Sequence, residues 1–286
     1  SRALTRDEAR EAMGLILSGA AAPEAVGALL MLLRYRGETA PEIAGFVAAM
    51  RLRLPAGWSR LGPALDWPSL AAGRSRGAPL FLLAARLVAR AGYRVLLHGY
   101  NSHQSGPADV RAALPACGIR SVTSPDEAAA MLARDGIVYV PLDILLPEAL
   151  ALLRLRDVLG LRSGVNTVLR MLNPGDARAS VQGVFHPSYR DLQADTAACL
   201  GRDTLTIIKG GGGEFERGGH CLPPGLLIPV HSAKVASARH LVKALPRPDR
   251  LVDHGRAASD YRRVNALDND DDIVTGRESL DRLAVD

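Results

Sequence analysis

The sequence predicts an α/β protein in which a small helical subdomain accompanies a larger α/β domain with a mainly parallel central sheet. Two patterns support this fold class. The first sixty residues show helical periodicity with two capping boxes, and after Pro63 short β-rich runs alternate with helical stretches. With 286 residues, of which 48% are hydrophobic, the chain is long enough to bury a sizeable core.

Three helices are expected in the first part of the chain. The segment from Thr5 to Glu8 is a capping box ahead of apolar residues at helical spacing, and Gly19 closes that helix. A second helix begins near Pro23. The capping box from Thr39 to Glu42 opens a third.

Beyond residue 63 the elements alternate in the order expected of helices that cover a parallel sheet. Strands are expected at 95–97, 137–140, 181–185 and 205–208, and helices at 80–91, 108–114 and 147–172.

This pattern predicts two domains. The helical subdomain is expected to comprise residues 1–62 and 146–172, and the α/β domain residues 63–145 and 173–286. The last forty residues are polar, turn-rich and weakly periodic, so no element is assigned to them.

Membrane and disulfide-rich classes are disfavoured. No run of about 18 apolar residues occurs, and no basic segment leads into an apolar one near the first residues, so we expect a cytoplasmic protein without a membrane partner. Cys117, Cys199 and Cys221 are odd in number and widely spaced, which fits neither a disulfide framework nor a CxxC metal site.

Positive charge is concentrated in one stretch of the chain. The formal net charge is +5, and only three of the 35 basic residues are lysines. Residues 34–94 contain ten arginines and three acidic residues, whereas residues 265–286 contain seven acidic residues and two arginines. This distribution indicates a polyanion partner or a tail that screens the basic surface; scattered, solvated arginines are the alternative.

The segment from His98 to Asp109 has the composition of an anion-binding turn. It follows an expected strand and leads into an expected helix, an arrangement in which backbone N–H groups can face an anion. An ordinary strand-to-helix loop is the alternative that the spacing leaves open. The candidate phosphate- or substrate-binding residues are His98, Gly99, Asn101, Ser105 and Gly106.

This segment resembles the His-Gly-Asn-Arg and Ser-x-Ser-Gly-Ser-Ala-Asp segment of anthranilate phosphoribosyltransferases, in glycosyltransferase family 3, which contributes to their phosphoribosyl diphosphate site. Residues 34–45 resemble the family's Arg-x-Lys-Gly-Glu-Thr helix junction, and residues 159–174 its Leu-Gly-Ile-Arg-Thr to Leu-Asn-Pro stretch. Residues 183–187 match the strand that follows. The resemblance covers roughly residues 1–230 and implies an α/β fold of the nucleoside phosphorylase/phosphoribosyltransferase type.

One departure from the family concerns its diphosphate loop. Where the enzymes carry Gly-Thr-Gly-Gly-Asp, this chain has Leu65-Asp66-Trp67-Pro68-Ser69. We expect the bulk of Trp67 and the missing N–H of Pro68 to prevent the same backbone cradle. Arg74 and Arg76 follow between glycines, and their side chains suit the phosphates of a repeating backbone as well as a small diphosphate.

A second departure lies at residues 209–217. The enzymes have an adjacent Asp-Glu pair there, which binds magnesium through the diphosphate. Here Glu214 and Glu216 alternate around Phe215, so a weak magnesium site and a glycine turn with solvated acids are both open. Lys209 adds a cation near the expected cleft.

The resemblance also assigns a role to an arginine. Arg156 aligns with the arginine that recognises the anthranilate carboxylate in the enzymes. Arg154 and Arg162 lie on the same expected helical stretch, where salt-bridged structural roles are the alternative.

The missing glycine loop, the Asp-Trp-Pro-Ser start and the Lys-Gly-x-Gly-Gly-Glu turn resemble the YbiB-like branch of the family. That resemblance implies a homodimer, formed through the helical subdomain, that binds single-stranded DNA or RNA without strong sequence preference. The leading hypothesis is therefore a non-catalytic or weakly catalytic nucleic-acid-binding protein that needs no cofactor. Its phosphate contacts are expected at Arg74, Arg76, Arg154, Arg156 and Lys209.

The alternative is an active glycosyltransferase of the same fold. It would use a phosphoribosyl diphosphate-type donor, with magnesium at Glu214 and Glu216 and electrostatic stabilisation of the leaving diphosphate.

Overall fold

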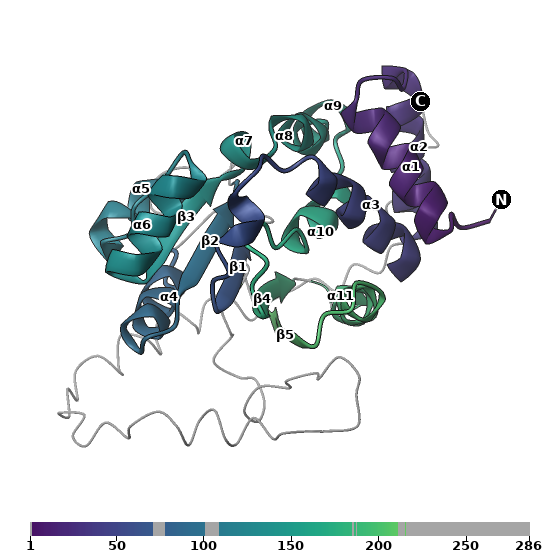
Figure 1. Ribbon diagram of the computed structural model, residues 1–286. Coiled ribbons are helices and arrows are strands. Elements are labelled where there is room, and N and C mark those ends of the chain that lie inside the picture. Colours follow the sequence, from purple (N-terminus) through teal and green to yellow (C-terminus); the bar gives the residue numbers. More distant parts are fainter. Residues whose placement is uncertain are drawn as a thin grey trace, which may run out of the picture. The chain divides into compact units, whose positions relative to one another are not determined.

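The computed structural model describes residues 2–70, 78–100, 109–184, 186, 188–210 and 215, which all lie in one compact unit, Ser1–Val235 (Figure 1). Its centre is a five-stranded parallel sheet in the order β3-β2-β1-β4-β5. The strands are β1 (Leu65–Ser69), β2 (Val95–Gly99), β3 (Ile137–Pro141), β4 (Ala179–Val184) and β5 (Thr204–Lys209). The predicted α/β class with a parallel central sheet is confirmed.

Helices connect consecutive strands. Helix α4 (Phe81–Arg90) lies between β1 and β2, α5 (Val110–Ala113) and α6 (Pro125–Asp135) between β2 and β3, and α11 (Ser188–Cys199) between β4 and β5. The remaining helices are α1 (Arg6–Leu17), α2 (Pro23–Arg36), α3 (Ala40–Leu52), α7 (Leu142–Leu145), α8 (Pro147–Arg154), α9 (Arg156–Leu159) and α10 (Val165–Arg170). Within the part of the chain that the structure describes, no helix is both long and apolar enough to cross a membrane.

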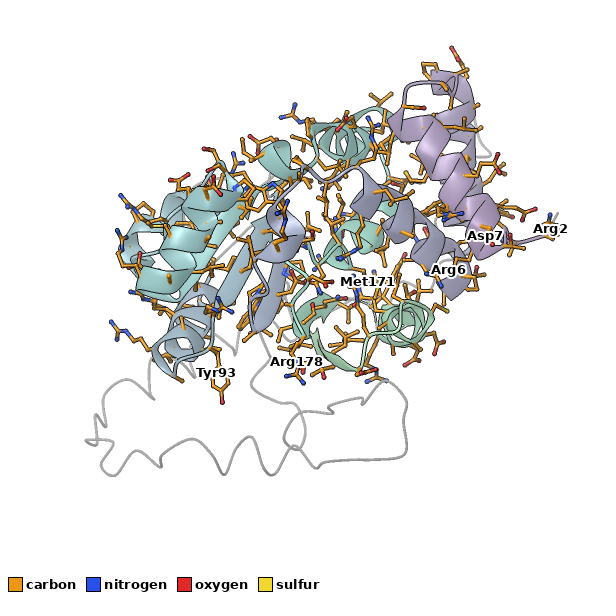
Figure 2. All side chains as sticks on the ribbon, in the orientation of Figure 1. Arg2, Arg6, Asp7, Tyr93, Met171 and Arg178 are labelled. Carbon is orange, nitrogen blue, oxygen red and sulfur yellow. The ribbon has the colours of Figure 1, made fainter. Side chains whose placement is uncertain are left out.

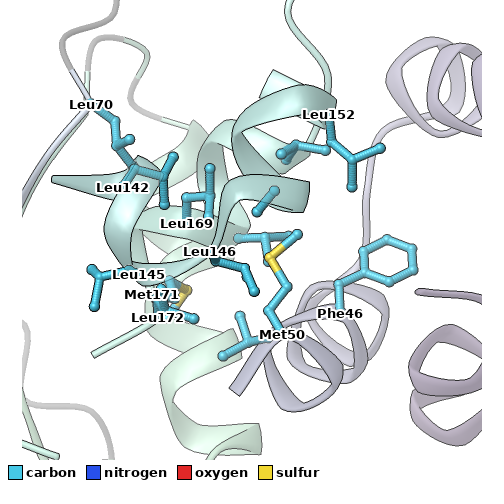
Figure 3. Packing of buried hydrophobic residues seen from close by; sticks show 14 of the residues in the cluster. Phe46, Met50, Leu70, Leu142, Leu145, Leu146, Leu152, Leu169, Met171 and Leu172 are labelled. Atoms are coloured by element: carbon cyan, nitrogen blue, oxygen red, sulfur yellow. The ribbon is translucent and has the colours of Figure 1, made fainter. Parts of the chain in front are cut away.

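Alternate strand residues face opposite sides of the sheet, and each side has its own core. On one side Leu97 and Tyr139 pack with Trp67 and with Phe81 of α4. On the other side strand residues such as Leu96 join a larger core that includes side chains of α1, α3, α8 and α10. Figure 3 shows part of this core. This larger core contains side chains from both the helical segments and the sheet. It therefore gives no boundary between two domains, and the predicted division stays a prediction.

The two predicted capping boxes are present at the starts of α1 and α3. At α3, the Glu42 carboxylate accepts hydrogen bonds from the N–H and hydroxyl of Thr39, from the Leu4 N–H and from Arg36. Burial raises the pKa of this carboxyl, but these hydrogen bonds outweigh burial and hold it below its usual value. Glu42 therefore fixes α1, α2 and α3 together at one point.

Several elements differ from the sequence-based expectation. The segment 147–172 forms three helices instead of one, and Gly160, with φ 69°, ends α9. Helix α5 has four residues, and neither α6 nor α11 was expected. The apolar spacing continues across the breaks in 147–172, so periodicity alone does not reveal them.

The strand order reverses next to β1, because β2 and β3 lie on one side of it and β4 and β5 on the other. In open parallel sheets, ligands bind at the carboxyl ends of the strands near such a reversal. The segments that follow β1, β2 and β5 at this edge, 71–77, 101–108 and 211–214, lie outside the described residues. The candidate site is built from what borders them.

Candidate functional site: an arginine-lined pocket

The carboxyl ends of β1 and β2 approach each other closely at Gly99. This residue has φ 149°, and a Cβ at this position would overlap the carbonyl oxygen of Ser69, so a glycine is required. The Tyr100 N–H donates to the same carbonyl at 3.2 Å. This contact fixes Leu70 and Tyr100, the residues that directly follow the two strands, on one side of a pocket.

Helices α8, α9 and α10 supply the other side of this pocket. Arg154 Nη2 donates to the Tyr100 hydroxyl at 2.7 Å, and its guanidinium carbon lies 5.5 Å from the Tyr100 ring centroid. The guanidinium carbon of Arg111, which pairs with Asp143, lies 5.8 Å from the same centroid. The lining residues, called the arginine-lined pocket below, are Leu70, Tyr100, Leu153, Arg154, Arg156, Asp157, Arg162, Ser163 and Asn166.

Arg156 brings an unused donor to the arginine-lined pocket. Its Nη1 is buried and has no hydrogen-bond partner among the described residues. Buried polar groups usually have a hydrogen-bond partner, so this donor is available to a ligand atom in the pocket. Guanidinium groups pair most strongly with planar oxyanions, which makes a carboxylate or phosphate the chemistry that fits.

Asn166 ties α10 to the end of β1. Its side-chain amide donates to the Leu70 carbonyl at 3.4 Å, and its oxygen accepts from Arg170 Nε at 3.2 Å. The helix that borders the pocket is thereby fixed relative to the strand that borders it.

The predicted site residues are only partly brought together within the described residues. Arg154 and Arg156 both line the pocket. Lys209 ends β5, and its side chain is not described. His98 and Gly99 belong to β2, and seven further predicted residues lie outside the described residues: Arg74, Arg76, Asn101, Ser105, Gly106, Glu214 and Glu216.

The magnesium site at Glu214 and Glu216 stays a prediction. Where side chains are described, no group of three or more His, Cys, Asp or Glu residues is placed to hold a metal ion.

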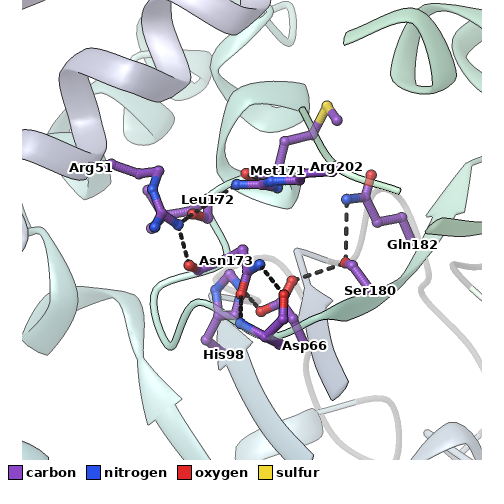
Figure 4. A network of polar contacts seen from close by, with 10 residues as sticks. Arg51, Asp66, His98, Met171, Leu172, Asn173, Ser180, Gln182 and Arg202 are labelled. Carbon is purple, nitrogen blue, oxygen red and sulfur yellow. Dashed lines mark hydrogen bonds and ion pairs between the residues drawn. The ribbon is translucent and has the colours of Figure 1, made fainter. Parts of the chain in front are cut away.

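His98 lies in a buried polar network on the sheet rather than in the pocket lining. Its Nε2 is 3.1 Å from Asp66 Oδ1, and both side chains are almost completely buried. The Ser180 hydroxyl donates to the other Asp66 oxygen at 2.9 Å, and Gln182 donates to that hydroxyl at 3.4 Å (Figure 4). These contacts link β2, β1 and β4.

The expectation that Trp67 and Pro68 occupy the diphosphate loop is wrong, because Leu65 to Ser69 form β1. Strand β1 pairs with β2 along all five residues but with β4 only at Leu65 and Asp66, so Pro68 lies beyond the β4 ladder. Trp67 packs in the core, with ring centroids 6.1 Å from Phe81 and 5.6 Å from Phe215. Trp67 and Pro68 are therefore both strand residues.

Sequence reasoning missed Tyr100 and Asn166 as site residues. Both stand in segments that carry the family resemblance, but neither is an obvious anion ligand by type. The available signal was positional, since Tyr100 directly follows an expected strand.

The parallel sheet, the helical segment before it and the arginine-lined pocket are the features of a class of protein, the glycosyltransferases with an N-terminal helical bundle. The family model described as "Glycosyl transferase family, helical bundle domain" matches residues 1–53. Anthranilate phosphoribosyltransferase from Rhizobium rhizogenes is 34% identical over 212 residues, which are 73% of this chain and 61% of that protein. The enzyme from Bacillus caldotenax is 32% identical over 220 residues, which are 75% of this chain and 88% of that sequence. The chain belongs to the anthranilate phosphoribosyltransferase family.

Solved structures show the same fold. The anthranilate phosphoribosyltransferase of Thermus thermophilus matches with a TM-score of 0.67 at 28% identity, covering 75% of this chain and 64% of that one. The Saccharomyces cerevisiae enzyme, in complex with PRPP and Mg, matches with a TM-score of 0.58 at 17% identity, covering 74% and 63%. This chain thus spans less than two thirds of these enzymes and of the Rhizobium relative.

Proposed function

We propose that the protein is a glycosyltransferase of the phosphoribosyltransferase type, in which the arginine-lined pocket holds the carboxylate of an aromatic amine acceptor. The observation that carries this proposal is the buried, unpartnered Nη1 of Arg156. It is supported by relatives at 32 and 34% identity that are anthranilate phosphoribosyltransferases, because anthranilate is an aromatic amine with a carboxylate.

In the proposed reaction the acceptor nitrogen attacks C1 of the ribose of phosphoribosyl diphosphate. The C1–O bond to the diphosphate breaks, the diphosphate leaves with the electron pair, and the nitrogen loses a proton to solvent. Arg156 and its neighbours contribute orientation, because a carboxylate held in the pocket limits the positions that the amine can take.

The donor half of this site is assigned to segments next to the pocket in sequence. Asn101, Ser105 and Gly106 follow Tyr100 and are assigned to the phosphates. Magnesium at Glu214 and Glu216 would supply positive charge to the leaving diphosphate. The yeast enzyme's structure with PRPP and Mg supports magnesium use in the family.

Trp67 and Pro68 do not by themselves argue against a transferase, although the family's Gly-Thr-Gly-Gly-Asp sequence is absent from the segment after β1 as well. Because both residues lie in β1, the chain available to hold a diphosphate is the segment that follows the strand, residues 70–77. That segment contains Gly73 and Gly77, together with Arg74 and Arg76.

A second candidate function is the binding of single-stranded nucleic acid in the same cleft, as in the YbiB-like branch. It is favoured by the exposed Arg154 beside Tyr100 at the pocket and by Arg74 and Arg76 in the adjacent segment. Phosphate contacts of this kind predict an affinity that falls steeply with salt and depends little on base sequence.

A homodimer formed through the helical segments is also part of the proposal. Leu32 and Tyr35 of α2 are 65% and 92% exposed, and two large apolar side chains three residues apart in a helix lie on one face. Analytical ultracentrifugation should give the mass of two chains at micromolar concentration. A single-chain mass at every concentration would contradict the dimer.

The activity is tested by incubating the full chain with phosphoribosyl diphosphate, Mg²⁺ and anthranilate and following the loss of anthranilate by chromatography. We expect product formation that stops when EDTA is added. An absence of product, combined with salt-sensitive binding of a fluorescent single-stranded oligonucleotide, would replace the transferase proposal with the second candidate.

A further inference from the structure

A second basic groove lies at the amino ends of β4 and β5, at the opposite edge of the sheet from the arginine-lined pocket. It has a volume of about 600 Å³ and lies beside α1, α3 and the two connections that lead into these strands. Among the described residues its charged lining consists of two acids, Asp176 and Asp203, and four arginines: Arg6, Arg51, Arg178 and Arg202.

Two of these arginines are held by the backbone at the end of α10. Arg51 donates to the carbonyl oxygens of Leu172, at 2.8 Å, and Asn173, while Arg202 Nη1 donates to that of Met171 at 2.6 Å (Figure 4). The last carbonyls of a helix lack partners within the helix, so these contacts have a structural role. Each guanidinium has five N–H donors, and the carbonyls do not use all of them.

The Arg202 guanidinium has no carboxylate in direct contact among the described residues, although Asp66 and Asp176 at longer range favour its charged form. Arg51 pairs with Asp176 at 2.9 Å, but no carboxylate of the described residues lies within ion-pair distance of Arg202. Burial lowers the pKa of Arg202 to about 10, because the guanidinium has lost solvent without gaining an acidic partner in contact. A bound anion would supply the missing charge.

The other two arginines reach the groove from the surface. Arg6, the first residue of α1, donates to the Cys199 carbonyl at 2.9 Å. Arg178 precedes β4 and is exposed, with no hydrogen bond or ion pair to any described residue (Figure 2). The described lining has two more arginines than carboxylates, an excess that a phosphate dianion would neutralise.

We propose that this groove is a phosphate-binding site, separate from the arginine-lined pocket and from the transferase reaction. Arg51 and Arg202 supply donors that the end of α10 already orients, and Arg6 and Arg178 add positive charge to the lining. The phosphate is either a free ion or one unit of a polynucleotide backbone, which present the same oxygens to guanidinium groups.

The test compares the full chain with the double variant Arg6→Gln/Arg178→Gln. Arg51 and Arg202 are left in place because they hold the end of α10. The control is Arg90→Gln, an exposed arginine at the end of α4 that does not line the groove. One arm measures the melting temperature in millimolar inorganic phosphate against chloride at equal ionic strength, and the other measures binding of a short fluorescent single-stranded oligonucleotide.

We expect the double variant to weaken binding about tenfold or more in at least one arm, because two charge-assisted contacts are lost, while Arg90→Gln binds as the wild type does. If the double variant loses the stabilisation by inorganic phosphate, the ligand is a free ion. If it loses only affinity for the oligonucleotide, the ligand is a polymer. Equal binding by wild type and double variant in both arms, or no binding by the wild type in either, would overturn the proposal. Neither result depends on transferase turnover, so the two proposals fail separately.

Discussion

At the scale of single residues, the pocket depends on side chains that are fixed by their neighbours. Arg154 is held against Tyr100 by a hydrogen bond and by ring contact, and Tyr100 is held by the turn at Gly99. Arg156 differs, because its buried Nη1 has no partner among the described residues. Among the described residues, the pocket therefore presents one buried donor that is available to a ligand.

Replacing Gly99 with alanine should lower the free energy of unfolding by about 2–4 kcal/mol, because the new Cβ would overlap the Ser69 carbonyl in a backbone conformation that suits glycine. Urea unfolding measures this loss. Gly92→Ala is the matched control, since Gly92 has φ 92° but nothing within 4 Å of its Cβ position, and it should cost only about 1 kcal/mol. Equal losses of unfolding free energy in the two variants would contradict the close contact between Gly99 and the Ser69 carbonyl.

Glu38 should make stability depend on pH. Its Oε1 is buried without a hydrogen-bond partner among the described residues, and burial raises the pKa of this carboxyl above 4.5. The folded state therefore binds the proton more tightly than the unfolded chain. The stability that Glu38 adds by binding this proton is fully present below about pH 4.5, the pKa of a glutamate in the unfolded chain. It is lost as the pH rises through the pKa of Glu38 in the folded state.

Glu38→Gln keeps the shape of the side chain and removes its charge. The melting temperature of the variant minus that of the wild type should therefore increase as the pH rises from 4.5 toward neutrality. Glu11→Gln, at an exposed position of α1, should show no such trend. A constant difference between Glu38→Gln and wild type across this range would rule out the effect.

At the scale of elements, helices α1 and α3 pack with almost no space at Gly45. A Cβ there would lie 2.7 Å from the Ala9 Cβ and would overlap the Arg6 carbonyl. Gly45→Ala should therefore destabilise the fold by about 1–3 kcal/mol through overpacking. Gly27→Ala in α2, with nothing within 4 Å of its Cβ position, should instead stabilise by about 0.5–1 kcal/mol through helix propensity. Urea unfolding that gives both changes the same sign would contradict this close packing.

Most of these elements follow from local sequence, and the exceptions have physical reasons. Capping boxes at Thr5 and Thr39 and the strands at β2 to β5 were predictable from caps and apolar runs. Strand β1 was not, because Pro68 argues against a central strand. It is accommodated where β4 no longer pairs with β1, which depends on tertiary register.

At the scale of the whole molecule, the sheet separates two basic sites. The arginine-lined pocket lies at the carboxyl ends of β1 and β2, and the groove around Arg178 and Arg202 lies at the amino ends of β4 and β5. An arginine-rich composition therefore produces two distinct surfaces within the described residues. Arg156 was found from the family resemblance and Arg154 from its place on the same expected helical stretch, whereas the contact between Arg154 and Tyr100 depends on tertiary structure.

The most direct test of the account is a calorimetric titration of anthranilate into the wild type, Arg156→Gln and the control Arg90→Gln. We expect Arg156→Gln to bind about 10- to 100-fold more weakly, because a charge-assisted hydrogen bond to the carboxylate is lost, and Arg90→Gln to bind as the wild type does. Equal affinity in Arg156→Gln and wild type, or no binding by the wild type, would contradict the assignment of this pocket to a carboxylate acceptor.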